Sequence, residues 1–224
     1  MQQTPFDAFT IADLLWRVRP RLLIELGTSG GGGALFYARV MRGYDPEARV
    51  LTYDPALAGT LNSRPLRNWN QPLMNKFCPH CVLPSDTSLW EDAVTFIRGT
   101  PTDPEPLSFG QELVANISGQ GYPVLITEDS NHMEDTVIQN IRAFAPLVTP
   151  GSFMIVQDTR GGLFSGPSNA ITTFLREQHA QPLYDHKGTR VLFRRDRGPE
   201  YFFFSQHCGG YLRRLEEREM SPTT

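Results

Sequence analysis

Short apolar runs alternate with helix-like segments along most of the chain, and this alternation constrains the fold more than any other feature. Runs of strand length cover residues 21–26, 49–53, 94–98, 122–127 and 153–156. Segments with apolar residues at helical spacing lie between most of them. Strands that alternate with helices form a parallel sheet covered on both faces. We therefore predict an α/β, doubly wound, Rossmann-like fold with a mostly parallel sheet.

The remaining segments complete this prediction. Helices are expected at residues 6–18, 34–42, 107–117, 133–148 and 168–178. Near the C-terminus, residues 190–193 and 201–205 are expected to form paired antiparallel strands. Residues 55–92 are rich in Pro, Asn and polar residues and show little periodicity, and a stretch of that length is usually functional. We expect one domain over residues 1–224, with 55–92 as an insertion beside the ligand site.

Composition excludes several classes of protein. The chain of 224 residues is 40% hydrophobic and 20% charged, with a formal net charge of −3. Such a chain is neither an acidic disordered tail nor a protein whose bulk charge attracts nucleic acid. No apolar run approaches the ~18 residues of a membrane span, and the N-terminus lacks the plan of a secretory signal. We expect a soluble cytoplasmic protein with no nucleic-acid partner.

The chain has three cysteines, an odd number that argues for a reducing compartment. Cys78 and Cys81 lie in a Cys-Pro-His-Cys run, and Cys208 is isolated near the end. Three interpretations stay open. The pair could be a redox dithiol, a reduced loop pair, or part of a zinc site completed by Cys208 and His207.

Glycine and polar residues follow each of the five predicted parallel strands. In doubly wound sheets the ligand lies outside the carboxyl ends of the strands. The tendency of Gly and Asp to form turns would by itself explain one such cluster. Five clusters at one edge of the sheet indicate a binding site. The clusters are Glu25–Gly33, Asp54, Gly99–Asp103, Glu128–His132 and Gln157–Thr159.

The glycine-rich loop after the first strand indicates which cofactor binds. The dinucleotide pattern G-x-G-x-x-G does not fit, because Ser29 stands where its second glycine should be. Glu25 and Gly27 instead match the E/D-x-G-x-x-x-G pattern of S-adenosylmethionine-binding enzymes, in which a carboxylate suits an ammonium group. We predict cofactor contacts from Glu25, Gly27, Thr28, Ser29 and Gly33. The alternative is a flexible loop with no ligand.

Residues after the later strands extend the predicted cofactor site. Asp54 is placed to accept hydrogen bonds from both ribose hydroxyls, and Gly99 and Thr100 would flank the adenine. Asp129, after the fourth strand, also borders this site.

The run Asp129-Ser-Asn-His132 carries the predicted chemistry. Asp129, Ser130 or Asn131 could simply cap the next helix. Alternatively, Asp129 and the Gln157–Thr159 cluster offer oxygen ligands that suit Mg²⁺. The metal would lower the pKa of an acceptor hydroxyl, and His132 would take its proton. We predict Asp129 and His132 as catalytic residues.

Six segments together resemble the cephalosporin-hydroxylase-like family, which includes metal-dependent macrolide-sugar and polysaccharide O-methyltransferases. In order they are IELGTSGGGG, FIRGTPTDPE, ITEDSNH, VTPGSFMIVQDT, GPSNAITTFL and GGYLRR. The resemblance implies a Rossmann-like methyltransferase fold, S-adenosylmethionine as cofactor, and His132 as base. It also implies Mg²⁺ bound by Asp129, Gln157 and Asp158. The family has Glu where this chain has Gln157, so the implied site carries one negative charge fewer.

A hydroxylase is disfavoured despite the family name. A non-haem iron oxygenase needs two histidines and a carboxylate as a facial triad, and the histidines here show no such spacing. A nicotinamide dehydrogenase is disfavoured by the glycine loop.

We therefore expect an O-methyltransferase that acts on a hydroxyl of a sugar, glycoside or polysaccharide with Mg²⁺ assistance. The acceptor would be a small molecule or an oligosaccharide, and the mild net charge suits a neutral one. Trp69, Phe77 and Trp90 would either stack on a sugar or pack in the core. We also expect a homo-oligomer. The alternatives are a natural-product O-methyltransferase and a ligand-binding domain without catalysis.

Overall fold

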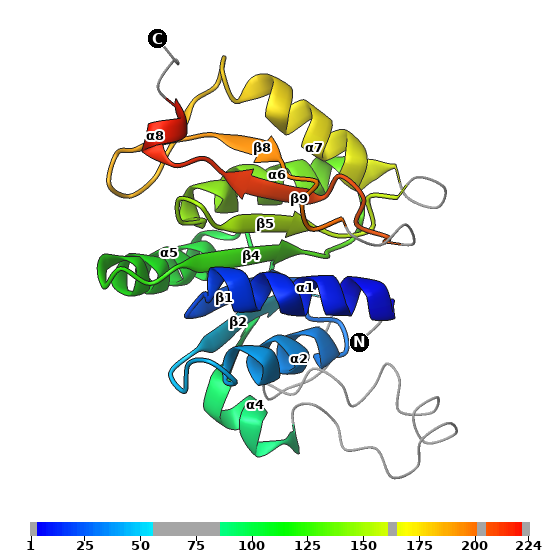
Figure 1. Cartoon of the computed structure of the whole chain (residues 1–224), viewed down its shortest axis with the longest axis vertical. Coiled ribbons are helices and arrows are strands. Elements are labelled where there is room, and N and C mark those ends of the chain that lie inside the picture. Colours follow the sequence, from blue (N-terminus) through cyan, green and yellow to red (C-terminus); the bar gives the residue numbers. More distant parts are fainter. Residues whose placement is uncertain (1–3, 56–85, 161–164, 201–204, 221–224) are drawn as a thin grey trace.

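The computed structural model describes residues 4–55, 86–160, 165–200 and 205–220. A seven-stranded sheet forms its centre (Figure 1). Its strands are β1 (Leu22–Leu26), β2 (Arg49–Asp54), β3 (Val94–Arg98), β4 (Val124–Glu128), β5 (Phe153–Val156), β8 (Phe193–Arg195) and β9 (Tyr211–Arg214). A separate pair consists of β6 (Leu183–Tyr184) and β7 (Arg190–Val191).

The strand order is β3-β2-β1-β4-β5-β9-β8. The first five strands of this order run parallel, and β9 and β8 are antiparallel to their neighbours. This confirms the predicted doubly wound fold with antiparallel C-terminal strands. The order reverses between β1 and β4, so the carboxyl ends of these two strands flank the switch point where ligands bind in such sheets.

Helices cover both faces of the sheet. They are α1 (Pro5–Val18), α2 (Gly32–Met41), α4 (Ser88–Ala93), α5 (Pro104–Gly119), α6 (Glu134–Phe144), α7 (Gly166–Glu177) and α8 (Glu217–Met220), with a 3-10 turn η2 (Ala145–Leu147) after α6. In Figure 1, α1 lies across the near face and α5 and α6 lie behind the sheet. None of the described helices is long and apolar enough to span a membrane.

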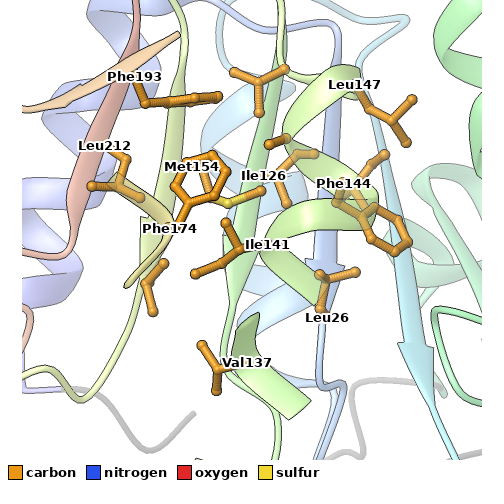
Figure 2. Packing of buried hydrophobic residues seen from close by; sticks show 14 of the residues in the cluster. Leu26, Ile126, Val137, Ile141, Phe144, Leu147, Met154, Phe174, Phe193 and Leu212 are labelled. Atoms are coloured by element: carbon orange, nitrogen blue, oxygen red, sulfur yellow. The ribbon is translucent and has the colours of Figure 1, made fainter. Parts of the chain in front are cut away.

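Two apolar layers hold the sheet between its helices. One layer packs buried side chains of α1, α2 and α4 against the sheet. The other packs α5, α6 and α7 against the opposite face, with Phe144, Met154 and Phe174 among its fully or nearly buried members (Figure 2). Phe144 also meets the ring of Tyr53 edge-on at 5.8 Å between centroids. Burial of this kind is the dominant favourable contribution to folding.

The predicted pairing of residues 190–193 with 201–205 needs correction. Residues 201–204 lie outside the described part of the chain, and Ser205 is not in a strand. The partner of β8 is β9 instead. Sequence patterning missed β9 because it contains Arg213 and Arg214. Arg214 is nevertheless 1% exposed, because it binds the carboxylate of Asp185 at 2.6 Å.

The predicted insertion at 55–92 is described only at its ends. Residues 56–85, with Trp69, Phe77, Cys78 and Cys81, lie outside the described residues. The last residues of the insertion form the first part of α4. There Thr87 Oγ1 accepts a hydrogen bond from the Trp90 N–H at 3.2 Å and so caps the helix. Trp90 is 6% exposed and packs in the α1–α2–α4 layer. Of the two alternatives for Trp90, core packing is therefore correct.

Candidate active site

Glu25 lies buried at the end of β1 beneath the glycine loop. Its Oε2 accepts a hydrogen bond from Thr52 Oγ1 at 2.6 Å, and the hydroxyls of Thr52 and Thr28 are also 2.6 Å apart. Burial raises the pKa of Glu25 to about 8, although the Thr52 hydrogen bond opposes this, and the nearby charges of Asp129 and Asp54 add to the rise. The sequence analysis placed Glu25 at the cofactor site, and the structure places it directly under the loop.

One position of the loop requires glycine for steric reasons, and a second leaves little room for a side chain. A Cβ on Gly27 would lie 2.1 Å from the carbonyl oxygen of Asp129, and its φ is +110°. A Cβ on Gly33 would lie 2.3 Å from Glu25 Oε1. The loop backbone therefore passes against the end of β4, and the first turn of α2 rests on the Glu25 carboxylate.

The loop is also pinned to the end of β2. The backbone N–H groups of Gly27 and Thr28 donate to the carbonyl of Tyr53 at 3.0 and 3.1 Å. The Ser29 N–H donates to Asp54 Oδ2 at 2.7 Å, and Ser29 has a φ of +44°. Asp54 is thus held beside the loop, which is where a ribose-binding carboxylate is expected.

Gly99 and Thr100 follow β3, beside Asp54. The Gly99 N–H donates to the Asp54 carbonyl at 3.3 Å, and the Thr100 N–H donates to Asp103 Oδ2 at 3.3 Å. The structure therefore brings these two residues to the same edge as the loop, and their contact with adenine stays a prediction.

Asp129, His132 and Asp158 meet at the carboxyl ends of β4 and β5. The Nε2 of His132 lies 3.3 Å from Asp129 Oδ1 and 3.1 Å from Asp158 Oδ2. One ligand-type atom from each residue lies within 4.8 Å of the others. His132 and Asp158 have φ values of +60° and +53°. Left-handed backbone is uncommon outside glycine and clusters at functional sites. We call these three residues the Asp-His-Asp cluster.

The two carboxylates stabilise a positive charge on His132. Hydrogen bonds to Asp129 and then to Asp158 raise the pKa of His132 to about 10, against a smaller effect of burial. In return, the His132 hydrogen bond lowers the pKa of Asp158. The cluster therefore has the charge balance of a site built to hold a cation between two carboxylates.

Gln157, the residue before Asp158, makes a hydrogen bond to helix α2. It is 3% exposed, and its Nε2 donates to the hydroxyl of Tyr37 at 3.2 Å, on the α2 side of the sheet. The structure thus brings together Asp129 and Asp158 but directs the Gln157 amide nitrogen toward α2. The role of Gln157 as a metal ligand stays a prediction.

Asp129 does not cap α6. The N-cap position is Met133, with no side-chain cap hydrogen bond, and the Met133 N–H donates to Asn131 Oδ1 at 3.1 Å. Glu128, the residue before Asp129, is buried. It accepts hydrogen bonds from the Ser130 N–H at 2.9 Å and from the Asn140 side-chain amide at 2.9 Å. These contacts fix the turn that presents Asp129 to the cluster.

His207 is a supporting residue whose role the sequence did not indicate. It is 2% exposed, and its Nδ1 accepts a hydrogen bond from the Asp158 N–H at 3.2 Å. Ser205 Oγ, two residues earlier, donates to Asp7 Oδ1 of α1 at 2.6 Å. The sequence analysis considered His207 only as a zinc ligand beside Cys208. No motif spacing links His207 to Asp158, because the contact spans 49 residues.

Fold and site together define a class of protein. A glycine loop after β1, a carboxylate at the end of β2 and an acidic cluster after β4 and β5 are arranged as in S-adenosylmethionine-dependent methyltransferases. The family described as Rhamnosyl O-methyltransferase/CmcI matches residues 1–68 and 85–215, and the chain belongs to this family. This confirms the resemblance found in the sequence.

Curated relatives carry the same description. The chain is 26% identical over 175 residues to a rhamnosyl O-methyltransferase of Mycobacterium bovis (strain BCG / Pasteur 1173P2), covering 75% of this chain and 60% of the relative. It is 25% identical over 180 residues to that of Mycobacterium leprae (strain TN), covering 76% and 66%. The chain therefore spans about three fifths of the length of the first of these relatives.

Solved structures share the fold. The structure described as cmcI-N160 SAH superposes with a TM-score of 0.56 at 17% identity, covering 96% of this chain and 78% of that one. The structure described as cmcI-D160 Mg-SAM gives a TM-score of 0.56 at 17% identity, covering 96% and 74%. At this identity the similarity establishes the fold alone.

Proposed function

We propose that this protein is an O-methyltransferase that moves a methyl group from S-adenosylmethionine to a hydroxyl of a sugar, glycoside or polysaccharide. The observation that carries the proposal is the Asp-His-Asp cluster directly beside the glycine loop, where Gly27 packs on the carbonyl of Asp129. The rhamnosyl O-methyltransferases among its relatives support a sugar acceptor. One domain over residues 1–224 is part of the same proposal.

The cofactor would lie across the ends of β1 and β2. Backbone N–H groups of the Gly27–Gly33 loop would approach the cofactor closely, and the Asp54 carboxylate, held beside the loop by the Ser29 N–H, would accept hydrogen bonds from the ribose hydroxyls. Glu25 would contribute charge from below the loop, because its pKa of about 8 allows a bound ammonium group to draw it into the ionised form.

The cluster residues fit a divalent cation. Asp129 and Asp158 have side chains 36% and 29% exposed, so both carboxylates face a reachable site. Mg²⁺ prefers one or two carboxylates together with waters and substrate oxygens. When bound, Mg²⁺ would lower the pKa of the acceptor hydroxyl. A cation on these carboxylates would also replace the positive charge of His132.

His132 would then accept the proton of the acceptor hydroxyl. Its Nε2 already faces both carboxylates, at 3.3 and 3.1 Å. As His132 takes the proton, the hydroxyl oxygen would attack the sulfonium methyl in line and form the O–CH3 bond. The bond between methyl and sulfur breaks, its electron pair stays on sulfur, and S-adenosylhomocysteine leaves. This step depends mostly on positioning.

Two binding experiments test the cofactor half of this proposal. Calorimetric titration with S-adenosylmethionine should show binding, and titration with NADH should show none. Asp54→Asn should weaken S-adenosylmethionine about tenfold or more, because a charge-assisted hydrogen bond becomes neutral. Asp13→Asn, which removes an exposed carboxylate paired with Arg17 on α1, is the matched control. NADH binding in preference to S-adenosylmethionine would overturn the proposal.

A further inference from the structure

A pocket of about 540 Å³ beyond the end of β5 contains three arginines, Arg160, Arg195 and Arg197. Ser168 and Glu200 also line it. We call it the arginine pocket. Its volume lies in the range of small-molecule binding sites. Its lining differs from that of a typical sugar site, because three of its side chains carry a guanidinium group.

The arginine pocket adjoins the Asp-His-Asp cluster. Arg160 follows Asp158 by two residues. At the first residue of α7, a Cβ on Gly166 would lie 2.1 Å from the carbonyl oxygen of His132. The pocket thus lies on the β5–β9 side of the cluster, and the glycine loop lies on the β1 side. An acceptor that reaches the cluster from the side opposite the cofactor would pass through it.

The pocket has an excess of positive charge. Three arginines and one carboxylate, Glu200, line it, and that carboxylate accepts the Gly209 N–H at 2.7 Å. Arg195 donates to the neutral hydroxyl of Thr172 at 2.9 Å. Within the described residues, no ion pair joins Arg195 or Arg197 to a carboxylate.

Three neighbouring arginines on β8 and β9 lie close to carboxylates. Arg214 pairs with Asp185 at 2.6 Å, and Arg213 pairs with Glu219. Arg194 of β8 lies 3.8 Å from Glu219 of α8. Arg195 and Arg197 are therefore set apart from these neighbouring arginines, because neither has an ion pair within the described part of the chain.

The start of α7 adds to this positive potential. Ser168 lies in the first turn of this 12-residue helix, and the N-cap Ser165 makes no side-chain cap hydrogen bond. The first N–H groups of a helix, together with its dipole, favour an anion. Guanidinium groups bind phosphate through paired hydrogen bonds.

We propose that the arginine pocket binds a phosphoryl group of the acceptor, so that the substrate is a sugar linked to phosphate, such as a sugar phosphate or a nucleotide sugar. This inference rests on the proposed methyl transfer at the neighbouring cluster. It revises the expectation of a neutral acceptor, because the net charge of −3 averages over the chain and hides this local excess of positive charge.

Anion binding tests the pocket without any assay of catalysis. Calorimetric titration of the full chain with inorganic pyrophosphate and with glucose 1-phosphate should show binding that weakens as salt rises. The double variant Arg195→Gln, Arg197→Gln should weaken both about tenfold or more. Arg194→Gln, on the same strand but paired with Glu219, is the matched control and should leave binding unchanged. Equal binding by the double variant and the wild type would overturn the inference.

Methyl-transfer assays then show which kind of phosphate-bearing sugar is the acceptor. They also distinguish failure of this inference from failure of the methyltransferase proposal. UDP-glucose, glucose 1-phosphate and methyl glucoside are compared as acceptors, with S-adenosylmethionine as donor. The double variant should raise KM for the phosphate-bearing acceptors about tenfold and change kcat less. Equal kcat/KM for methyl glucoside and both phosphorylated sugars would overturn the inference and leave the methyltransferase proposal standing. Failure to bind S-adenosylmethionine would overturn the methyltransferase proposal, whatever the anion titration shows.

Discussion

The backbone N–H of Asp158 donates a hydrogen bond to the Nδ1 of His207 at 3.2 Å. Asp158 needs such support, because its φ of +53° is a conformation that non-glycine residues adopt at a cost. The His207 side chain is 2% exposed. It lies on a loop that is joined to α1 by the hydrogen bond between Ser205 and Asp7. The N-terminal helix and the C-terminal loop thus jointly fix one carboxylate of the cluster.

Replacing His207 should therefore loosen Asp158. In His207→Leu the Asp158 N–H loses its acceptor, which should cost about 1–3 kcal/mol of unfolding free energy. Mg²⁺ affinity, measured by calorimetry, should also fall. His207→Asn, which can still offer an acceptor oxygen, should recover part of both losses. His179→Leu, at an exposed position, is the control. Unchanged Mg²⁺ affinity in folded His207→Leu would show that this hydrogen bond does not position Asp158.

Gly27 should tolerate no side chain. Gly27→Ala would place a Cβ 2.1 Å from the Asp129 carbonyl oxygen at a φ of +110°, so we expect a loss of about 3 kcal/mol or more in unfolding free energy. Gly119→Ala, near the end of α5 with no atom within 4 Å of its Cβ, should be neutral or slightly stabilising. Chemical denaturation of both variants compares them directly. Equal stability would contradict the close approach of the loop to β4.

Glu25 should make stability fall as pH rises toward 8. Its pKa is raised to about 8, chiefly by burial, so folding favours the protonated form. That contribution is complete below the ordinary pKa of 4.5 and is lost as pH rises to about 8. In Glu25→Gln this part of the pH dependence should disappear, which denaturation between pH 5 and 9 would reveal. A wild-type slope that persists in Glu25→Gln would assign the pH dependence to another group.

Asp185 should make stability fall as pH falls into the acid range. Burial acts to raise its pKa, but hydrogen bonds from Arg214 and from the Thr189 and Lys187 N–H groups outweigh burial and lower it. The stability it contributes is present above its unfolded pKa of about 3.9 and is lost as pH falls through the folded value. Asp185→Asn should cost about 3–5 kcal/mol at pH 7, because Arg214 stays buried without its partner. Asp13→Asn should cost under about 1 kcal/mol. A small loss in Asp185→Asn would mean that water replaces the carboxylate.

The sequence predicted the part of the fold that depends on local patterning. The strands β1, β2, β4 and β5 are apolar and almost fully buried, so their runs stand out. The strand β3 is also an apolar run, although it is only partly buried. The strand β9 was missed because Arg214 owes its burial to Asp185, a partner 29 residues away. The contact between His207 and Asp158 was missed for the same reason, since neither residue has a local pattern that indicates the other.

The placement of Gln157 shows a second limit of prediction from sequence, which concerns residues that are adjacent in a motif. Successive side chains on a strand point to opposite faces, so Gln157 and Asp158 need not serve one site. Gln157 extends the face of Ile155 toward Tyr37. Asp158, with its positive φ, turns toward His132. The motif names adjacent residues, and the backbone decides where each of their side chains points.

The most direct test of the account is metal-dependent methyl transfer. Wild-type protein is incubated with radiolabelled S-adenosylmethionine and a panel of sugars and phosphorylated sugars, with Mg²⁺ or with EDTA, beside Asp129→Asn and the control Asp13→Asn. We predict transfer to a sugar hydroxyl that EDTA abolishes and Mg²⁺ restores, with Asp129→Asn reduced at least about a hundredfold and Asp13→Asn unchanged. Transfer at the same rate in EDTA and in Asp129→Asn would contradict the role assigned to the Asp-His-Asp cluster.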